Sequence, residues 1–293
     1  MKKTQSIAGI GIALIIGGLI LIAGSHGSIE IAGLPLFVVC GLIGFGLHWT
    51  IFLPSFVFKT DHYFDLTGSI SYISTVAAVV LLNPELDLRD LIICVMIVVW
   101  ALRLGSFLFL RIKKEGKDTR FNIMKTQFLW FLMTWTLGGL WVLATMAAGL
   151  AAITSGTSLP LGPIAYLGIV LWVFGMGIEV IADRQKSLFR RIPENQGRFI
   201  TTGLWAWSRH PNYFGEITLW LGLSLVALPV LAGWQLATMV SPVFVYLLLT
   251  RVSGIPLLEA LAEKRWGTDP VFIAYRDGTP ALMLRKPKSS KNS

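Results

Sequence analysis

Eight long apolar stretches constrain the fold of this chain more than any other feature. They cover residues 5–24, 33–58, 67–82, 90–111, 127–152, 160–182, 214–233 and 235–254. A helix that crosses a bilayer needs about 20 mainly apolar residues, and most of these stretches are long enough. Only 14% of the residues are charged, against roughly 25% in a soluble chain. The sequence therefore predicts an all-α fold: a polytopic integral membrane helix bundle with seven to eight transmembrane helices.

The first stretch leaves the number of spans open. Lys2 and Lys3, an apolar core and the small residues 23–25 also fit a signal peptide. Its removal would leave seven spans and would not move any later loop. We expect residues 1–30 to form the first span and an outer loop. Residues 31–285 should form a single membrane domain, and residues 286–293 a polar tail.

The basic residues predict how the chain is oriented in the membrane. If the N-terminus lies inside, 23 of the 25 Lys and Arg residues fall in segments on the inner side. Arg89 alone lies outside, and Arg103 lies within a span. This asymmetry favours cytoplasmic N- and C-termini, in the inner membrane if the cell is bacterial. It also explains the net charge of +9, so we expect a lipid bilayer and no nucleic acid as a partner.

The familiar metal and nucleotide motifs are missing from the sequence. Cys40 and Cys94 both lie in apolar runs and should be buried thiols. No paired cysteines, HExxH motif or Walker motif occurs, so the sequence predicts no metal site. GMGIE at 175–179 faintly resembles a dinucleotide fingerprint, but it lies in a predicted membrane helix with no strand before it.

Polar residues at membrane depth are costly and suggest function. In EVIADRQKSLFRR, residues 179–191, Glu179 and Asp183 are four residues apart and share one helix face. Arg190 follows two turns later, at the predicted cytoplasmic end of the sixth span. The alternative interpretation is interfacial charge held in helix-pair salt bridges, and we prefer it for Lys186 and Arg191.

A second polar group occupies GLWAWSRHPNYFGE, residues 203–216. Pro211 is suited to the first turn of a helix. The start of that helix would present unpaired N–H groups, which together with Arg209 and His210 suit an anion such as a diphosphate. Asn212 can both donate and accept hydrogen bonds. The alternative is an interfacial cap with a belt of aromatic residues.

Two further segments carry isolated polar residues. Arg251 ends the eighth stretch, residues 253–256 should break the helix, and Glu259 lies in an amphipathic helix. Arg103 lies mid-span, at least two turns from the nearest loop, so its side chain should face the bundle interior rather than the interface. His48 is interpreted as a packing residue.

Three segments resemble the bacterial branch of the steroid 5-alpha-reductase superfamily. They are GMGIEVIADRQKSLFR, GLWAWSRHPNYFGEI, and SGIPLLE followed by RWGTDPVFIAY. The resemblance covers about 60–280 and is best over 165–280. RHPNY followed by an acidic residue is also shared with membrane sterol reductases and, more loosely, with isoprenylcysteine carboxyl methyltransferases.

The resemblance implies an NADPH-dependent oxidoreductase that reduces an activated C=C bond in a lipid-like substrate. It places NADPH among the C-terminal helices, about residues 160–280. Arg103 matches a basic position in the catalytic cavity. Trp100 stands where the steroid-reducing members have a Tyr, and no residue matches their Glu, so the substrate could equally be an isoprenoid or acyl lipid. The cofactor-binding positions of the family are matched, or closely neighboured, by Glu179, Asp183, Arg190, Arg209, His210, Asn212, Arg251 and Glu259.

Two other functions remain open from the sequence. An S-adenosylmethionine-dependent methyltransferase of lipids or isoprenoids would need fewer basic residues, because arginines suit the phosphates of NADPH. A transporter usually shows two matching halves with broken helices, and no such symmetry is visible in the sequence. Nothing in the sequence indicates the oligomeric state.

Overall fold

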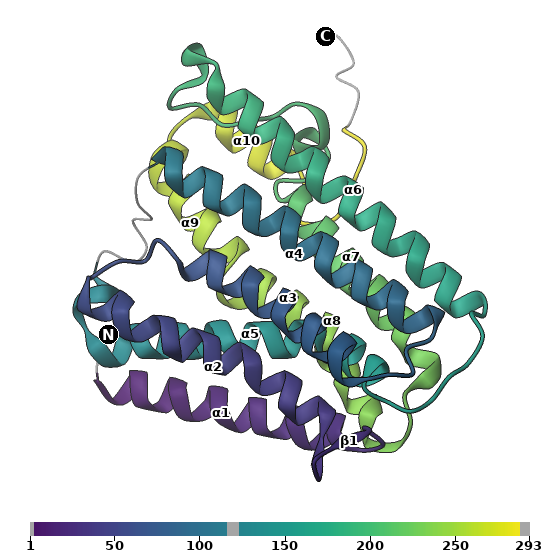
Figure 1. Cartoon of the computed structure of the whole chain (residues 1–293). Coiled ribbons are helices and arrows are strands. Elements are labelled where there is room, and N and C mark those ends of the chain that lie inside the picture. Colours follow the sequence, from purple (N-terminus) through teal and green to yellow (C-terminus); the bar gives the residue numbers. More distant parts are fainter. Residues whose placement is uncertain (1–2, 116–122, 288–293) are drawn as a thin grey trace. The chain divides into compact units, whose positions relative to one another are not determined.

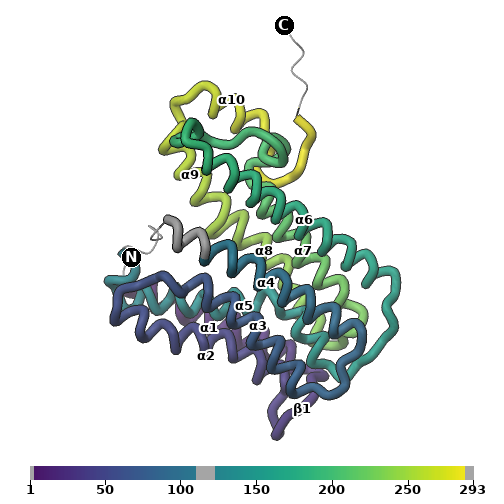
Figure 2. Tube along the Cα trace, turned by 45° about the horizontal axis from the view of Figure 1, so that its top comes forward, coloured from purple at the N-terminus to yellow at the C-terminus, as the bar shows by residue number. Residues whose placement is uncertain are grey.

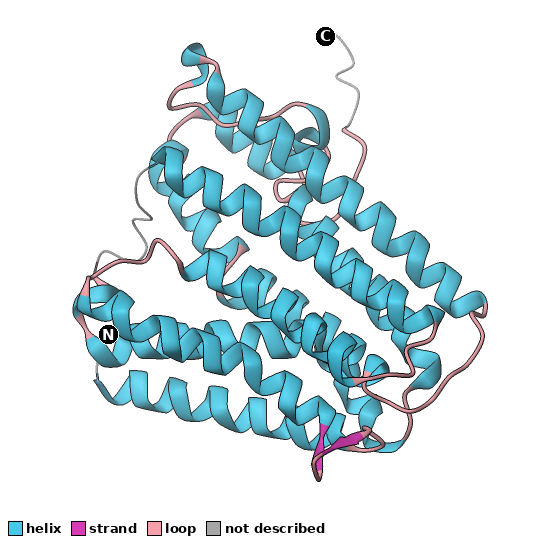
Figure 3. Ribbon diagram, in the orientation of Figure 1, coloured by secondary structure: helices cyan, strands magenta, loops and turns pink. Residues whose placement is uncertain are grey.

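The computed structural model describes residues 3–115 and 123–287, and most of them are helical (Figure 3). Within these residues the only sheet is a hairpin of two short antiparallel strands, β1 (Glu30–Ile31) and β2 (Leu34–Pro35). Ala32 and Gly33 at its tip have φ angles of 51° and 79°, the conformation that a tight two-residue hairpin turn requires. The all-α prediction is confirmed.

Eight helical segments of the described chain are long and apolar enough to cross a membrane. Their places agree with the eight apolar stretches, so the chain is a multi-pass membrane protein. The short third stretch is a full helix of 19 residues. The second helix ends at Val57, with Pro54 in its last turn. The segments are Lys3–Ser25, Leu36–Val57, Phe64–Leu82, Leu88–Phe109, Phe128–Ile153, Pro163–Arg191, Pro211–Val230 and Gly233–Trp266.

The chain forms two compact units, each made of two separate pieces of sequence. Unit 1 comprises Met1–Tyr166 and Leu223–Ser241, and unit 2 comprises Leu167–Gly222 and Pro242–Ser293. Most of unit 2 therefore lies within the part of the sequence, about 160–280, in which we expect the cofactor.

Unit 1 is built around one deeply buried helix. Helix α5 packs against α1, α2, α3 and α4 (Figure 1), and its residues from Val142 to Ile153 are all buried. Its sequence is apolar on all sides, as expected of a helix surrounded by others. The elements of the unit are α1 (Lys3–Ser25), the hairpin, α2 (Leu36–Val57), α3 (Phe64–Leu82), α4 (Leu88–Glu115), the 3₁₀ turn Met124–Thr126, α5 (Phe128–Ile153), and the turns Leu228–Val230 and Gly233–Met239.

Small residues allow the neighbours of α5 to approach it closely. A β-carbon on Gly139 would lie 2.8 Å from the Phe45 ring, and one on Gly149 would lie 2.7 Å from Leu223. Gly138 likewise makes room for the His48 imidazole, whose Nδ1 donates to the Gly44 carbonyl at 2.7 Å. His48 is thus accommodated as a packing residue of the core. Small residues at helix contacts are the usual means of tight association in membranes.

Unit 2 contains two long helices and a set of short ones. In both views α9 and α10 lie beside the segment that connects α6 to α7 (Figure 2). The elements are α6 (Pro163–Arg191, in this unit from Leu167), the turns Pro193–Asn195 and Gly203–Ala206, α7 (Pro211–Ala227, in this unit to Gly222), α8 (Val240–Leu247), a π-helix (Leu248–Val252), α9 (Ile255–Trp266) and α10 (Pro270–Gly278).

Glycines hold α6 and α7 in backbone contact. A β-carbon on Gly215 would lie 2.6 Å from the Gly175 carbonyl oxygen and 2.7 Å from the Glu179 nitrogen. One on Gly222 would lie 2.6 Å from the Gly168 carbonyl oxygen. The GMGIE segment is therefore a helix-packing motif, and its Gly175 serves close approach rather than nucleotide binding.

The eighth apolar stretch is not one regular helix. It begins as a 3₁₀ helix, continues as α8 and ends as the π-helix Leu248–Val252, where the Ser253 N–H donates to the Leu248 carbonyl at 2.9 Å. Ser253 and Gly254 then interrupt the helix before α9, as the sequence predicted. π-Helical turns are rare and often mark functional sites, and Arg251 lies within this one.

Candidate functional site

The segment that leads into α7 is fixed by hydrogen bonds on both sides. The Gln185 side chain on α6 accepts from the Leu204 N–H at 2.9 Å. The Arg209 N–H donates to the Pro280 carbonyl at 2.9 Å, and the fully buried Ser208 hydroxyl donates to the Leu282 carbonyl at 2.9 Å. Helix α7 begins at Pro211, which confirms that prediction.

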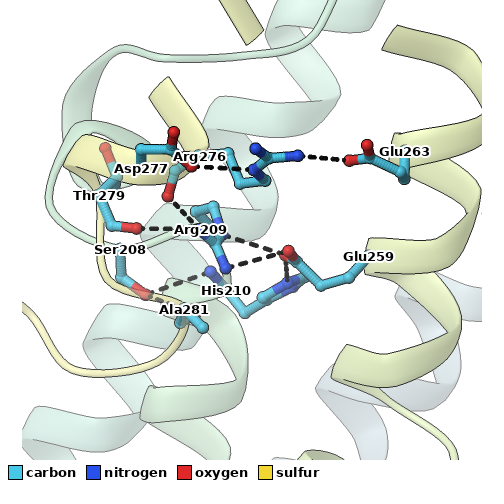
Figure 4. A network of polar contacts seen from close by, with 9 residues as sticks. All are labelled: Ser208, Arg209, His210, Glu259, Glu263, Arg276, Asp277, Thr279 and Ala281. Atoms are coloured by element: carbon cyan, nitrogen blue, oxygen red, sulfur yellow. Dashed lines mark hydrogen bonds and ion pairs between the residues drawn. The ribbon is translucent and has the colours of Figure 1, made fainter. Parts of the chain in front are cut away.

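Arg209, His210 and Glu259 form a compact network (Figure 4). Glu259 Oε1 accepts from His210 Nε2 at 2.7 Å and from Arg209 Nε at 3.1 Å. Its Oε2 lies 3.0 Å from Arg209 Nη2. The third guanidinium nitrogen, Nη1, donates to the carbonyls of Arg276 and Thr279. Two of the residues predicted from the RHPNY segment thus meet the one predicted from α9.

His210 is the most enclosed member of this network. Its side chain is 7% exposed, and the Tyr213 ring stacks on it at 5.7 Å with an interplanar angle of 11°. Burial lowers the pKa of His210, and the hydrogen bond to Glu259 opposes that shift. Within the described chain Nδ1 is buried and has no hydrogen-bond partner. Buried polar atoms without partners are uncommon and call for an explanation.

Tyr213 connects the network to the break after the π-helix. A β-carbon on Gly254 would lie 3.0 Å from the Tyr213 ring. The same β-carbon would come still closer to the Leu249 carbonyl oxygen, so the backbone before the break requires glycine here. Arg251 lies three residues earlier and is exposed.

A scaffold of aromatic residues, which the sequence did not predict, supports the site. The Tyr275 hydroxyl donates to the Trp205 carbonyl at 2.7 Å, and Trp205 Nε1 donates to the Ala182 carbonyl at 3.0 Å. Burial raises the pKa of Tyr275. Lys186 lies 4.4 Å above the Trp205 ring. For Trp205 an interfacial belt was the alternative interpretation, and only the partners in the fold distinguish a belt residue from a scaffold residue.

The acidic candidates on α6 are buried. Glu179 is 3% exposed and Asp183 is 8% exposed. Glu179 lies where α6 touches Gly215, one residue before Glu216, which is also buried. Glu179 and Asp183 share one face of α6, as their spacing predicts, and the structure shows that this face is buried. A buried carboxylate is stable only with charge or hydrogen-bond partners. The interior beside the C-terminal half of α6 must therefore contain polar groups.

The remaining candidates lie nearer the surface. Arg190 is exposed at the end of α6, and Asn212 is half-buried in the first turn of α7. Arg103 belongs to unit 1, where it is half-buried on α4 with its guanidinium 5.5 Å from the Phe107 ring centre. The eight candidate cofactor residues all belong to unit 2.

A family model described as "Protein of unknown function (DUF1295)" matches residues 51–279. The chain belongs to this family. It is steroid 5-alpha-reductase-like, as the three motif segments indicated. The match includes unit 2 up to α10 and leaves out α1 and the hairpin.

One curated relative is also similar. It is a probable O-methyltransferase, ustE, of Ustilaginoidea virens, 29% identical over 129 residues. The alignment covers 37% of this chain and 45% of that relative, so the chain spans less than half of the relative's length. No solved structure matches the chain. The family and this relative together indicate a membrane enzyme of reductase or methyltransferase type.

Proposed function

We propose that the chain is a membrane-embedded reductase that uses NADPH to reduce an activated C=C bond in a lipid-like substrate. One observation carries the proposal: unit 2 has buried carboxylates inside and exposed arginines outside. Glu179 and Asp183 are buried, whereas Arg190 and Arg251 are exposed. Carboxylates suit ribose hydroxyls and amide N–H groups, and arginines suit phosphates.

This distribution fits NADPH in chemical terms. Its nicotinamide amide and ribose hydroxyls donate hydrogen bonds, which the buried carboxylates can accept. Its diphosphate and 2′-phosphate are anions that the exposed arginines can bind bidentately. When bound, NADPH supplies the hydride. The protein supplies position, charge and a water-poor setting.

The chain's own residues then have separate roles. Asn212, in the first turn of α7, would orient the nicotinamide amide through its own amide. Arg190 and Arg251 would hold phosphates. Arg103, half-buried in unit 1, would contact the substrate.

A methyltransferase that uses S-adenosylmethionine is the second candidate. The ustE similarity favours it. So does the pairing of Arg209 with Glu259, which leaves one fewer arginine for phosphates. S-Adenosylmethionine has ribose hydroxyls but no phosphate, so the exposed arginines distinguish the two proposals.

Thermal shifts of the purified protein with NADPH, NADH and S-adenosylmethionine test the proposal. NADPH at 100 times its dissociation constant should stabilise the protein by about 2.7 kcal/mol. Arg190→Ala should reduce NADPH affinity by about one to two decades, because a charge-assisted contact is lost. Arg191→Ala, the neighbouring exposed arginine, is the matched control and should change affinity little. Stabilisation by S-adenosylmethionine alone would overturn the reductase proposal.

A further inference from the structure

Arg209 is fully committed to the protein. Its Nε and Nη2 bind the Glu259 carboxylate, and its Nη1 donates to two backbone carbonyls. A guanidinium whose three nitrogens all have protein partners has little to offer a ligand. The arginine of the RHPNY segment is therefore placed to hold Glu259 and the chain after α10.

Glu259 in turn determines the protonation of His210. A carboxylate accepts hydrogen bonds, so the 2.7 Å contact with Nε2 requires a proton on that nitrogen. Burial lowers the pKa of His210 and so favours the neutral imidazole, and the positive charges of Lys186 and Arg209 act in the same direction. The carboxylate of Glu259 acts in the opposite direction but is the smaller effect. In the neutral ring Nδ1 carries a lone pair and acts only as an acceptor.

That acceptor is hidden and unpaired. The His210 side chain is more than nine-tenths buried, and Nδ1 has no hydrogen-bond partner among the described residues. An unsatisfied buried acceptor is destabilising, so a donor that reaches it is bound favourably. Tyr213 stacks on the face of the imidazole and leaves the direction of the Nδ1 lone pair, which lies in the plane of the ring, to other neighbours.

We infer that His210 Nδ1 accepts a hydrogen bond from an O–H or N–H group of the bound cofactor, and that Glu259 and Arg209 are positioning residues for this imidazole. A phosphate cannot be the partner, because its oxygens accept hydrogen bonds and would need a donor, whereas Nδ1 is an acceptor. The ligand group is thus a ribose hydroxyl or an amide or amino N–H. The inference rests on the proposed function only in requiring a nucleotide-type cofactor at this site.

Two substitutions of His210 separate its two nitrogens. Asn places its amide near Nδ1, so His210→Asn keeps an acceptor there and gives up the contact with Glu259. Gln places its amide near Nε2, so His210→Gln keeps the contact with Glu259 and gives up the acceptor. Affinity is measured by titration with whichever of NADPH and S-adenosylmethionine stabilises the wild-type protein.

The two variants should rank in a defined order. His210→Gln should bind the cofactor about tenfold or more weakly than wild type, because one hydrogen bond is lost. Its melting temperature without cofactor, measured at pH 8, should match that of the wild type. His210→Asn should bind several-fold more tightly than His210→Gln. Equal affinities, or the opposite order, would show that the imidazole serves only to hold Glu259.

Glu259→Gln tests positioning rather than contact. Its amide can donate to Nε2, which releases the preference for one tautomer. We expect weaker cofactor binding and a changed ¹⁵N chemical shift of His210 Nδ1 in the free protein. An unchanged shift together with unchanged affinity would overturn the positioning role.

The outcomes also separate this inference from the proposed function. Binding of S-adenosylmethionine instead of NADPH refutes the reductase proposal, while the His210 variants still test the inference. Binding of NADPH with His210→Gln indistinguishable from wild type refutes the inference alone. Failure of both cofactors to stabilise the wild-type protein refutes both.

Discussion

Gly175 on α6 lies against Gly215 on α7 so closely that a β-carbon on Gly175 would come within 2.6 Å of the Gly215 carbonyl oxygen. The obstacle is backbone on both sides, so no side chain can move away to relieve a clash. Glu179 lies one turn further along α6, beside the same glycine. The position of this buried carboxylate therefore depends on the helix contact.

Alanine at Gly175 should destabilise the protein. Overpacking of this kind typically costs about 1–3 kcal/mol, enough to outweigh the gain of roughly 1 kcal/mol from replacing a helical glycine. Gly177→Ala is the matched control, because a β-carbon there would meet nothing within 4 Å. Melting curves in detergent should show a lower midpoint for Gly175→Ala and an equal or higher one for Gly177→Ala. Equal midpoints for both variants would contradict the tight contact.

Arg89 should be essential for the stability of unit 1. Its side chain is buried and donates to the carbonyls of Val226 at 2.6 Å and Pro160 at 2.9 Å. Arg89→Met would leave these acceptors without donors, at about 1.5–3 kcal/mol for each charge-assisted bond. We expect low yields of folded protein and a clearly reduced melting temperature, with Arg191→Met as an exposed control. If Arg89→Met has the melting temperature of the wild type, water must donate to these carbonyls in place of the guanidinium.

Stability should decrease in mild acid because of His210. Its pKa is lowered by burial in the folded protein, so the unfolded chain takes up a proton first, near pH 6.5. The folded protein therefore has its full stability, as far as His210 is concerned, above that pH and loses it progressively as the pH falls below it. Melting temperatures of the wild type and His210→Gln between pH 5 and 8 should diverge at the acidic end. Parallel curves would exclude this linkage.

The predicted orientation can be tested with single cysteines. Cys40 and Cys94 are buried and can be replaced first. Glu194→Cys, in the segment between α6 and α7, should resist a membrane-impermeant maleimide in intact cells because the segment is predicted to be cytoplasmic. Thr157→Cys, between α5 and α6, should react. Both positions are exposed, so labelling of Glu194→Cys from outside would reverse the topology.

Much of the fold could be predicted because membrane spans depend on length and hydropathy. The eight segments, the start of α7 at Pro211 and the break at Ser253 and Gly254 all follow from local composition. That Glu179 and Asp183 share one helix face follows from helical periodicity, whereas the burial of that face is seen only in the structure. The composite eighth span could not be predicted, because 3₁₀, α and π turns differ in hydrogen bonding and not in hydropathy.

The candidate site was predicted as a set of residues and not as a network. Arg209 and Glu259 are separated by 50 residues, and Tyr275 and Trp205 by 70. No spacing rule connects such distant positions, so the sequence could not show that Arg209 is paired within the protein. Arg89 is a similar case: it lies among acidic residues in the sequence, but its partners are carbonyls up to 137 residues away.

The division of each unit into two pieces of sequence bears on biosynthesis. Residues 223–241 complete unit 1, yet the ribosome makes them after 167–222, which belong to unit 2. Since chains insert from the N-terminus onward, neither unit can finish before most of the protein has been translated. A premature stop at any point before residue 242 should therefore leave unit 2 without its second piece and expose incomplete helices to membrane quality-control proteases.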